Sequence, residues 1–245
     1  MDTLEQLLRW IHIGLGFLGL VAFWFPIFSR KGGTLHRQAG NVFRFSAFAV
    51  LGAAGISLLL DYGRLISSQM GPAARPETWS FLLFLSYLTV VTAIILSHGF
   101  AVLRHKRDVK ALATSWRIVQ AWLALLSSVF IIGWAWYWQP KNAALLYALS
   151  PIGLLNGISM LRLYRAKTLG PKVWIQEHLG ALIGCGIAYH TAFSAFGARQ
   201  LFDYSLNGWL AVVPWILPTL LGIPAIMFWN RRYNQPAIAR TPSLG

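Results

Sequence analysis

Seven long apolar segments, separated by short polar stretches, constrain this chain more than any other feature. A helix of roughly 20 apolar residues crosses the ~30 Å hydrocarbon core of a bilayer. The segments cover residues 10–29, 42–60, 78–103, 118–138, 142–161, 179–198 and 204–230. Because they use up nearly all of the 245 residues, the sequence predicts an all-α, polytopic transmembrane bundle of seven helices. We expect one integral membrane domain over residues 1–245.

The composition supports a membrane protein and argues against a soluble one. Hydrophobic residues make up 56% of the chain and charged residues only 11%, whereas soluble domains carry roughly 25% charged residues. The net charge of +14 would suit a nucleic-acid partner if it formed a patch on a soluble module. Here the basic residues form short clusters between apolar segments, a pattern typical of chains that face anionic lipid. The lipid bilayer is therefore the expected partner, and nucleic acid is not.

The basic residues also predict an orientation. Of the 21 lysines and arginines, five would lie on one side of the membrane: Arg9, Arg64, Arg75, Lys141 and Arg199. The other 16 would lie on the opposite side: 15 between segments one and two, three and four, and five and six or in the tail, and Arg44 near the start of segment two. The positive-inside rule then places the amino terminus outside and the carboxyl terminus in the cytoplasm. The expected location is the cell inner membrane, with residues 231–245 as a short cytoplasmic tail.

Histidines within the apolar segments are the first candidates for function, since ionisable groups inside a membrane are costly and usually functional. We expect His12 and His190 at similar depth in the outer half, and His36, His98 and His178 at the inner end. Two imidazoles from different helices are natural axial ligands of a b-type haem. The expected pairs are His12 with His190, and His98 with His178, with His36 as an alternative inner ligand. Hydrogen bonding within the bundle is the competing interpretation.

A stripe of polar residues at the start of the second helix is the second candidate. Arg37, Asn41 and Arg44 lie at helical spacing and share one face. Arginine offers a planar donor fork to anionic oxygens, so the stripe could hold haem propionates, a lipid phosphate or an anionic substrate. Arg117, which opens the fourth helix, could join it. Simple snorkelling to lipid phosphates is the alternative.

The segment KGGTLHRQAGNVF also carries a resemblance to a known family. His12 in the first helix is followed by a motif made of Lys31, Gly32, Gly33, His36, Arg37, Gly40 and Phe43. This pattern, KGG-x-x-HR-x-x-G-x-x-F, resembles an uncharacterised family of predicted bacterial multi-pass membrane proteins, a domain of unknown function. The resemblance covers the first two helices and implies no activity. The layout is also similar to that of di-haem membrane cytochromes of the b type, by analogy only.

Three classes of function follow from these residues. The first is a membrane oxidoreductase that passes electrons within or across the membrane through haem b, with a quinol or another redox protein as partner. The second is a zinc-dependent hydrolase at the cytoplasmic rim, with His36, His98 and His178 as ligands and Glu177 polarising the water. The third is a non-enzymatic transporter, lipid-binding protein or accessory subunit, acting alone, as a homo-oligomer or within a complex. Prolines in the fifth and seventh segments favour a transporter.

Overall fold

The computed structural model describes residues 3–202, 210 and 213–234. Helices account for nearly all of these residues, and no strand occurs among them. Seven helical segments in this part of the chain are long and apolar enough to cross a membrane: Thr3–Phe28, Thr34–Ser67, Pro76–His105, Ser115–Trp138, Ala143–Tyr164, Val173–Phe202 and Val213–Tyr233. The predicted helical bundle is thus confirmed, and the protein is a multi-pass membrane protein.

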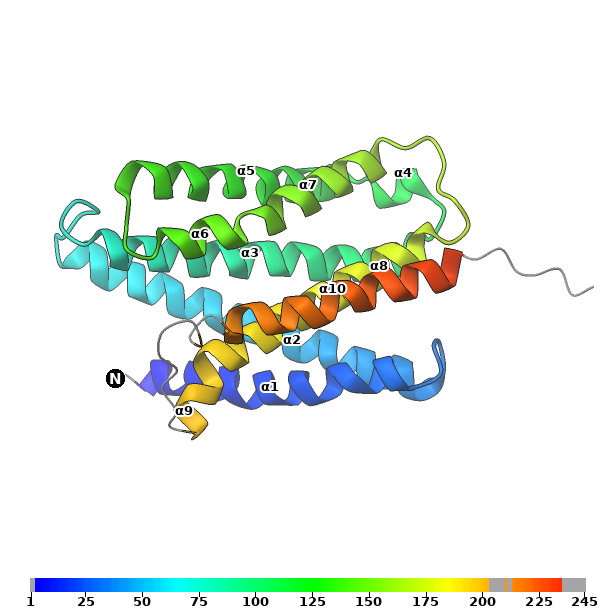
Figure 1. The fold of residues 1–245 in the computed structure, drawn as a ribbon, viewed down its shortest axis with the longest axis horizontal. Helices are drawn as coiled ribbons and strands as arrows, with labels where there is room; N and C mark the ends of the chain where they lie inside the picture. Colours follow the sequence, from blue (N-terminus) through cyan, green and yellow to red (C-terminus); the bar gives the residue numbers. More distant parts are fainter. Residues whose placement is uncertain (1–2, 203–209, 211–212, 235–245) are drawn as a thin grey trace, which may run out of the picture.

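The helices succeed one another with short connections. They are α1 (Thr3–Phe28), α2 (Thr34–Ser67), α3 (Pro76–His105), α4 (Val109–Leu112), α5 (Ser115–Trp138), α6 (Ala143–Leu149), α7 (Pro151–Tyr164), α8 (Val173–Ala192), the π-helical turn η1 (Phe193–Gly197), α9 (Ala198–Phe202) and α10 (Val213–Asn234). In Figure 1 the hairpin of α1 and α2 forms one side of the bundle and α5 with α7 the other. Between them, α3 packs against α5 and α8, and α10 packs on α8.

The second helix is longer than its apolar segment predicts. It begins at Thr34 and ends at Ser67, whereas the apolar segment covers residues 42–60. Hydropathy marks where the chain enters the apolar core, and a helix continues beyond that point wherever its polar side chains can reach water or lipid headgroups. The residues of the KGG motif that follow Gly33 are therefore helical, and the expected loop at 61–77 shrinks to the residues between Ser67 and Pro76.

Among the prolines of the fifth and seventh segments that the structure describes, Pro151 alone interrupts a helix. Pro151 separates α6 from α7, because proline has no N–H to continue the helix. The hydroxyl of Tyr87 from α3 closes this break: it accepts from the Gly153 N–H at 2.8 Å and lies 2.9 Å from the Ser150 carbonyl oxygen. Helix α10 runs on through Pro218 and Pro224. The predicted start of this segment, at residues 204–212, falls largely outside the described residues.

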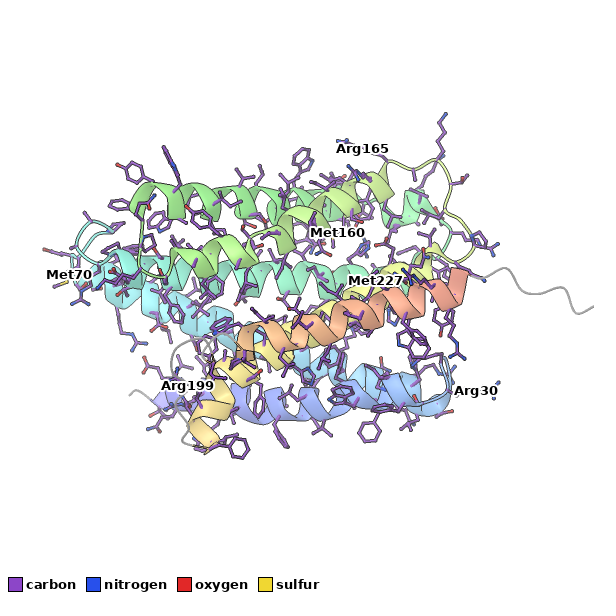
Figure 2. The ribbon with its side chains drawn as sticks, viewed as in Figure 1. Arg30, Met70, Met160, Arg165, Arg199 and Met227 are labelled. Carbon is purple, nitrogen blue, oxygen red and sulfur yellow. The ribbon has the colours of Figure 1, made fainter. Side chains whose placement is uncertain are left out.

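One end of the bundle carries most of the candidate residues, and we call it the basic end. It is formed by the turn 29–33, the segment 106–114 that contains α4, the loop 165–172 and the end of α10, at the right of Figure 1. Figure 2 shows Arg30 and Arg165 at this end, on opposite sides of the bundle, and Met70 at the other end. The gathering of loops with Lys and Arg at one end agrees with the basic side expected from the sequence.

Candidate functional site

The KGG motif forms a tight connection between α1 and α2. Gly32 has φ +75°, a left-handed conformation that glycine adopts without strain. Lys31 Nζ lies 2.7 Å from both the Pro26 and the Ile27 carbonyl oxygens. These carbonyls belong to the last turn of α1, where helical partners are missing. The lysine of the motif therefore caps a helix, a role that the sequence analysis did not assign to it.

Histidines 36 and 178 are held in the same way by backbone carbonyls. His36 Nδ1 lies 3.2 Å from the Pro26 oxygen, and His178 Nδ1 lies 2.8 Å from the Gly99 oxygen. A carbonyl oxygen can only accept, so each Nδ1 carries the proton and donates it. In the neutral imidazole the lone pair is then on Nε2. Metal-binding histidines are oriented by this kind of Nδ1–H bond to a carbonyl.

His36 of α2 and His178 of α8 both lie at the basic end of the bundle. They lie within electrostatic reach of each other. Phe100 of α3 packs edge-on against His178 with ring centroids 6.0 Å apart, and the Arg44 guanidinium lies 5.1 Å from the centroid of the same phenyl ring. His178 and Arg44 thus contact the same phenyl ring, and His36 lies within electrostatic reach of His178; we call these three residues the bis-histidine site.

Open space adjoins the His36 side of this site. Gly40 lies four residues after His36 and therefore on nearly the same face of α2. A Cβ atom added at Gly40 would meet no other heavy atom within 4 Å. By contrast, a Cβ at Gly186 of α8 would meet the Phe23 ring at 2.1 Å. The glycine of the HR-x-x-G motif is therefore not required by close helix packing.

His98 belongs to a separate, fully engaged network. It is 3% exposed; its Nε2 lies 3.1 Å from Glu177 Oε2 and its Nδ1 lies 2.8 Å from the Tyr164 hydroxyl. The carboxylate accepts from Nε2–H, and the tyrosine donates to Nδ1. Both ring nitrogens are occupied, so His98 has no lone pair free for a metal. The network ties α3, α7 and α8 together, and it turns Glu177 toward His98.

Arg117 lies next to this network. It is within electrostatic reach of Tyr164, and its Nε atom is buried without a hydrogen-bond partner among the described residues. Arg37, Asn41 and Arg44 are all exposed on α2. No acidic side chain of the described residues pairs with Arg37 or Arg44. That Arg117 joins the arginine stripe of α2 stays a prediction.

The structure does not bring His12 and His190 together. The backbone of Val50 in α2 is the hydrogen-bond partner of His12. His190 Nδ1 lies 2.7 Å from its own helix's Gly186 oxygen, and its Nε2 accepts from the Trp24 indole N–H at 3.2 Å. Trp24 is twelve residues, or about 18 Å of helix rise, beyond His12. In Figure 1, α8 runs obliquely to α1, and the bond to Trp24 places His190 against the last two turns of α1. An outer haem stays a prediction, and it would have to displace Trp24.

The zinc alternative requires three ligands at one point. Among the residues that the structure describes, no group of three or more His, Cys, Asp or Glu side chains is arranged to hold a metal ion. The expected set divides in two: His98 and Glu177 bond to each other, whereas His36 and His178 bond to separate carbonyls. The transporter interpretation loses one support as well, since Tyr87 satisfies the backbone at Pro151.

Two residues that contact the candidate histidines were missed by the sequence analysis. Phe100 and Tyr164 look like ordinary members of apolar segments, and only the packing of α3 against α2, α7 and α8 gives them polar partners. The one available signal is that Tyr164 ends its helix beside basic residues. The chain matches no protein-family model, and no curated protein or solved structure is significantly similar to it. The family resemblance of the first two helices accordingly stays a prediction.

Proposed function

We propose that the protein is a membrane redox protein that holds one b-type haem at its basic end, with His36 and His178 as the axial ligands. This revises the expected inner pair of His98 and His178 in favour of the alternative ligand His36. The observation that carries the proposal is the shared arrangement of the two imidazoles. Each donates Nδ1–H to a backbone carbonyl and keeps the lone pair of Nε2 available.

The residues around His36 and His178 fit a haem group. The open space at Gly40 gives room for a flat macrocycle beside His36. Arg44, which has no acidic partner among the described side chains, and Arg37 on the same face of α2 would bind the carboxylates of haem. Bound there, haem would supply one-electron redox chemistry, and the two imidazoles and the partly buried phenyl ring of Phe100 would tune its potential.

The orientation is part of the same proposal. The basic end faces the cytoplasm of a cell whose inner membrane holds the protein, and the amino terminus lies outside. The electron donor is a quinol or a redox protein. A single haem in the inner half of the bundle passes electrons within the membrane or to its cytoplasmic face.

Histidine variants test the ligand assignment. Protein purified after expression with ample haem is expected to show a Soret band that shifts on reduction with dithionite. His36→Ala and His178→Ala should each lose most of that band. His12→Ala and His105→Ala, which change histidines outside the bis-histidine site, should keep it. Colourless wild-type protein, or a full band in both site variants, would overturn the proposal.

Two glycine variants distinguish loss of haem binding from loss of folding. Gly40→Leu should fill the space beside His36 and abolish the Soret band. Gly52→Leu is the matched control, because Gly52 also lies in α2 and a Cβ there meets nothing within 4 Å. Both variants should retain the wild-type circular dichroism spectrum. If the two bind haem equally, Gly40 does not line the haem site.

A further inference from the structure

An apolar groove lies on the α1–α2 hairpin near the basic end. It has a volume of about 350 Å³ and is lined by Trp24, Phe25, Phe28, Ser29 and Leu35. The volume is at the lower end of the range for small-molecule sites. The three aromatic side chains are 44%, 46% and 81% exposed, and Leu35 is 52% exposed, so the groove opens outward along the surface of a membrane-spanning helix.

One polar atom of the groove has no partner. Ser29 Oγ is buried, and no hydrogen bond satisfies it within the described residues. Serine at the end of a helix usually bonds to a carbonyl of the preceding turn. Here Lys31 already occupies the Pro26 and Ile27 carbonyls. The hydroxyl therefore has no acceptor among the described residues and can donate to a bound ligand.

Positive charge adjoins this hydroxyl. Arg30 follows Ser29 directly, is exposed, and has no acidic partner among the described side chains. Figure 2 shows Arg30 at the outer edge of the α1–α2 turn. Lys31 uses two of its three ammonium protons on carbonyls. The groove is thus aromatic and aliphatic at its Trp24 end. At its other end lie a hydrogen-bond donor, the Ser29 hydroxyl, and a positive charge, the Arg30 guanidinium.

We propose that this groove binds one anionic phospholipid, with an acyl chain against Trp24, Phe28 and Leu35 and the phosphate at Ser29 and Arg30. The apolar lining excludes a free soluble anion as the intended ligand. The orphaned hydroxyl and the arginine at one end distinguish the site from a surface that merely contacts lipid tails. This binding does not depend on haem, and its tests are separate from those of the redox proposal.

Lipid binding can be measured by native mass spectrometry of the purified full-length protein. Phosphatidylglycerol should bind as a single preferred molecule, and phosphatidylcholine more weakly. One basic residue at an anionic lipid surface is worth about a fivefold change in affinity. Arg30→Gln should therefore weaken phosphatidylglycerol binding about fivefold, and Leu35→Trp, which fills the groove, should weaken both lipids.

Arg165→Gln is the matched control. Arg165 is an exposed arginine at the same end of the bundle and lies on the opposite side in Figure 2. This variant should bind phosphatidylglycerol like the wild type. Equal losses in the Arg30 and Arg165 variants would indicate a general basic surface and overturn the proposal. So would equal binding of the two lipids, or competition by inorganic phosphate alone at the concentration of the lipid.

Discussion

Tyr87→Phe tests how the bundle tolerates the break between α6 and α7. The Tyr87 side chain is 3% exposed, and its hydroxyl accepts from Gly153 N–H at 2.8 Å while facing the Ser150 oxygen at 2.9 Å. The first N–H groups of α7 have no partner in their own helix. Removing the hydroxyl takes away the acceptor of the buried Gly153 N–H. Each buried polar group without a hydrogen-bond partner costs about 1–3 kcal/mol of stability. In membrane proteins, a single side-chain hydrogen bond contributes about 0.6 kcal/mol on average and at most about 1.7 kcal/mol.

The expected loss in the free energy of unfolding is therefore about 1–3 kcal/mol. It can be measured by titrating SDS into mixed micelles while following helicity. Tyr62→Phe is the control, since its hydroxyl makes one bond of 3.2 Å, to Ser86, whose own hydroxyl also donates to the Leu82 oxygen. No group is orphaned there, so the loss should stay below about 0.6 kcal/mol. Equal losses in the two variants would refute the idea that Tyr87 repairs the break.

Three further outcomes are expected. Gly157→Ala should destabilise the protein by about 1–3 kcal/mol in the same titration, because the added Cβ would lie 2.7 Å from the Ala121 oxygen. Gly133→Ala should leave the stability unchanged, because a Cβ there meets nothing within 4 Å. A larger loss for Gly133→Ala than for Gly157→Ala would contradict the α5–α7 packing. Lys31→Met should lower the SDS midpoint by removing two carbonyl bonds, and an unchanged midpoint would show that the cap contributes nothing. An alkaline phosphatase fused to the carboxyl terminus should be inactive in cells, whereas activity there would reverse the predicted topology.

The number and type of the helices could be read from the sequence, because burial in lipid imposes its condition on each segment separately. A helix satisfies its backbone internally and needs about 20 apolar residues to cross the bilayer. The helix limits were harder to predict. The end of α2 at Ser67 and its start at Thr34 lie outside the apolar segment, since polar residues extend a helix as readily as apolar ones beyond the hydrocarbon core.

From the sequence, the candidate site could be predicted only as a set of residue types at one end of the bundle. The sequence pointed to His36, His98, His178 and Glu177 as neighbours at the inner face. Which ring nitrogens are free depends on carbonyls and hydroxyls of other helices. Gly99 and Tyr164 make His178 and His98 different from each other, although both lie at the same end of the bundle.

Local rules thus determined the number and type of the helices and the clustering of positive charge, since hydropathy and charge act through the nearest few residues. The tertiary structure decided which histidines keep a lone pair, which glycines are tightly packed and where His190 lies relative to α1. The oblique course of α8 relative to α1 brings the His190 imidazole to Trp24, and helical periodicity contains no information about such a tilt. Side chains far apart in the chain meet according to helix tilt and packing, which arise only when all the helices share one interior.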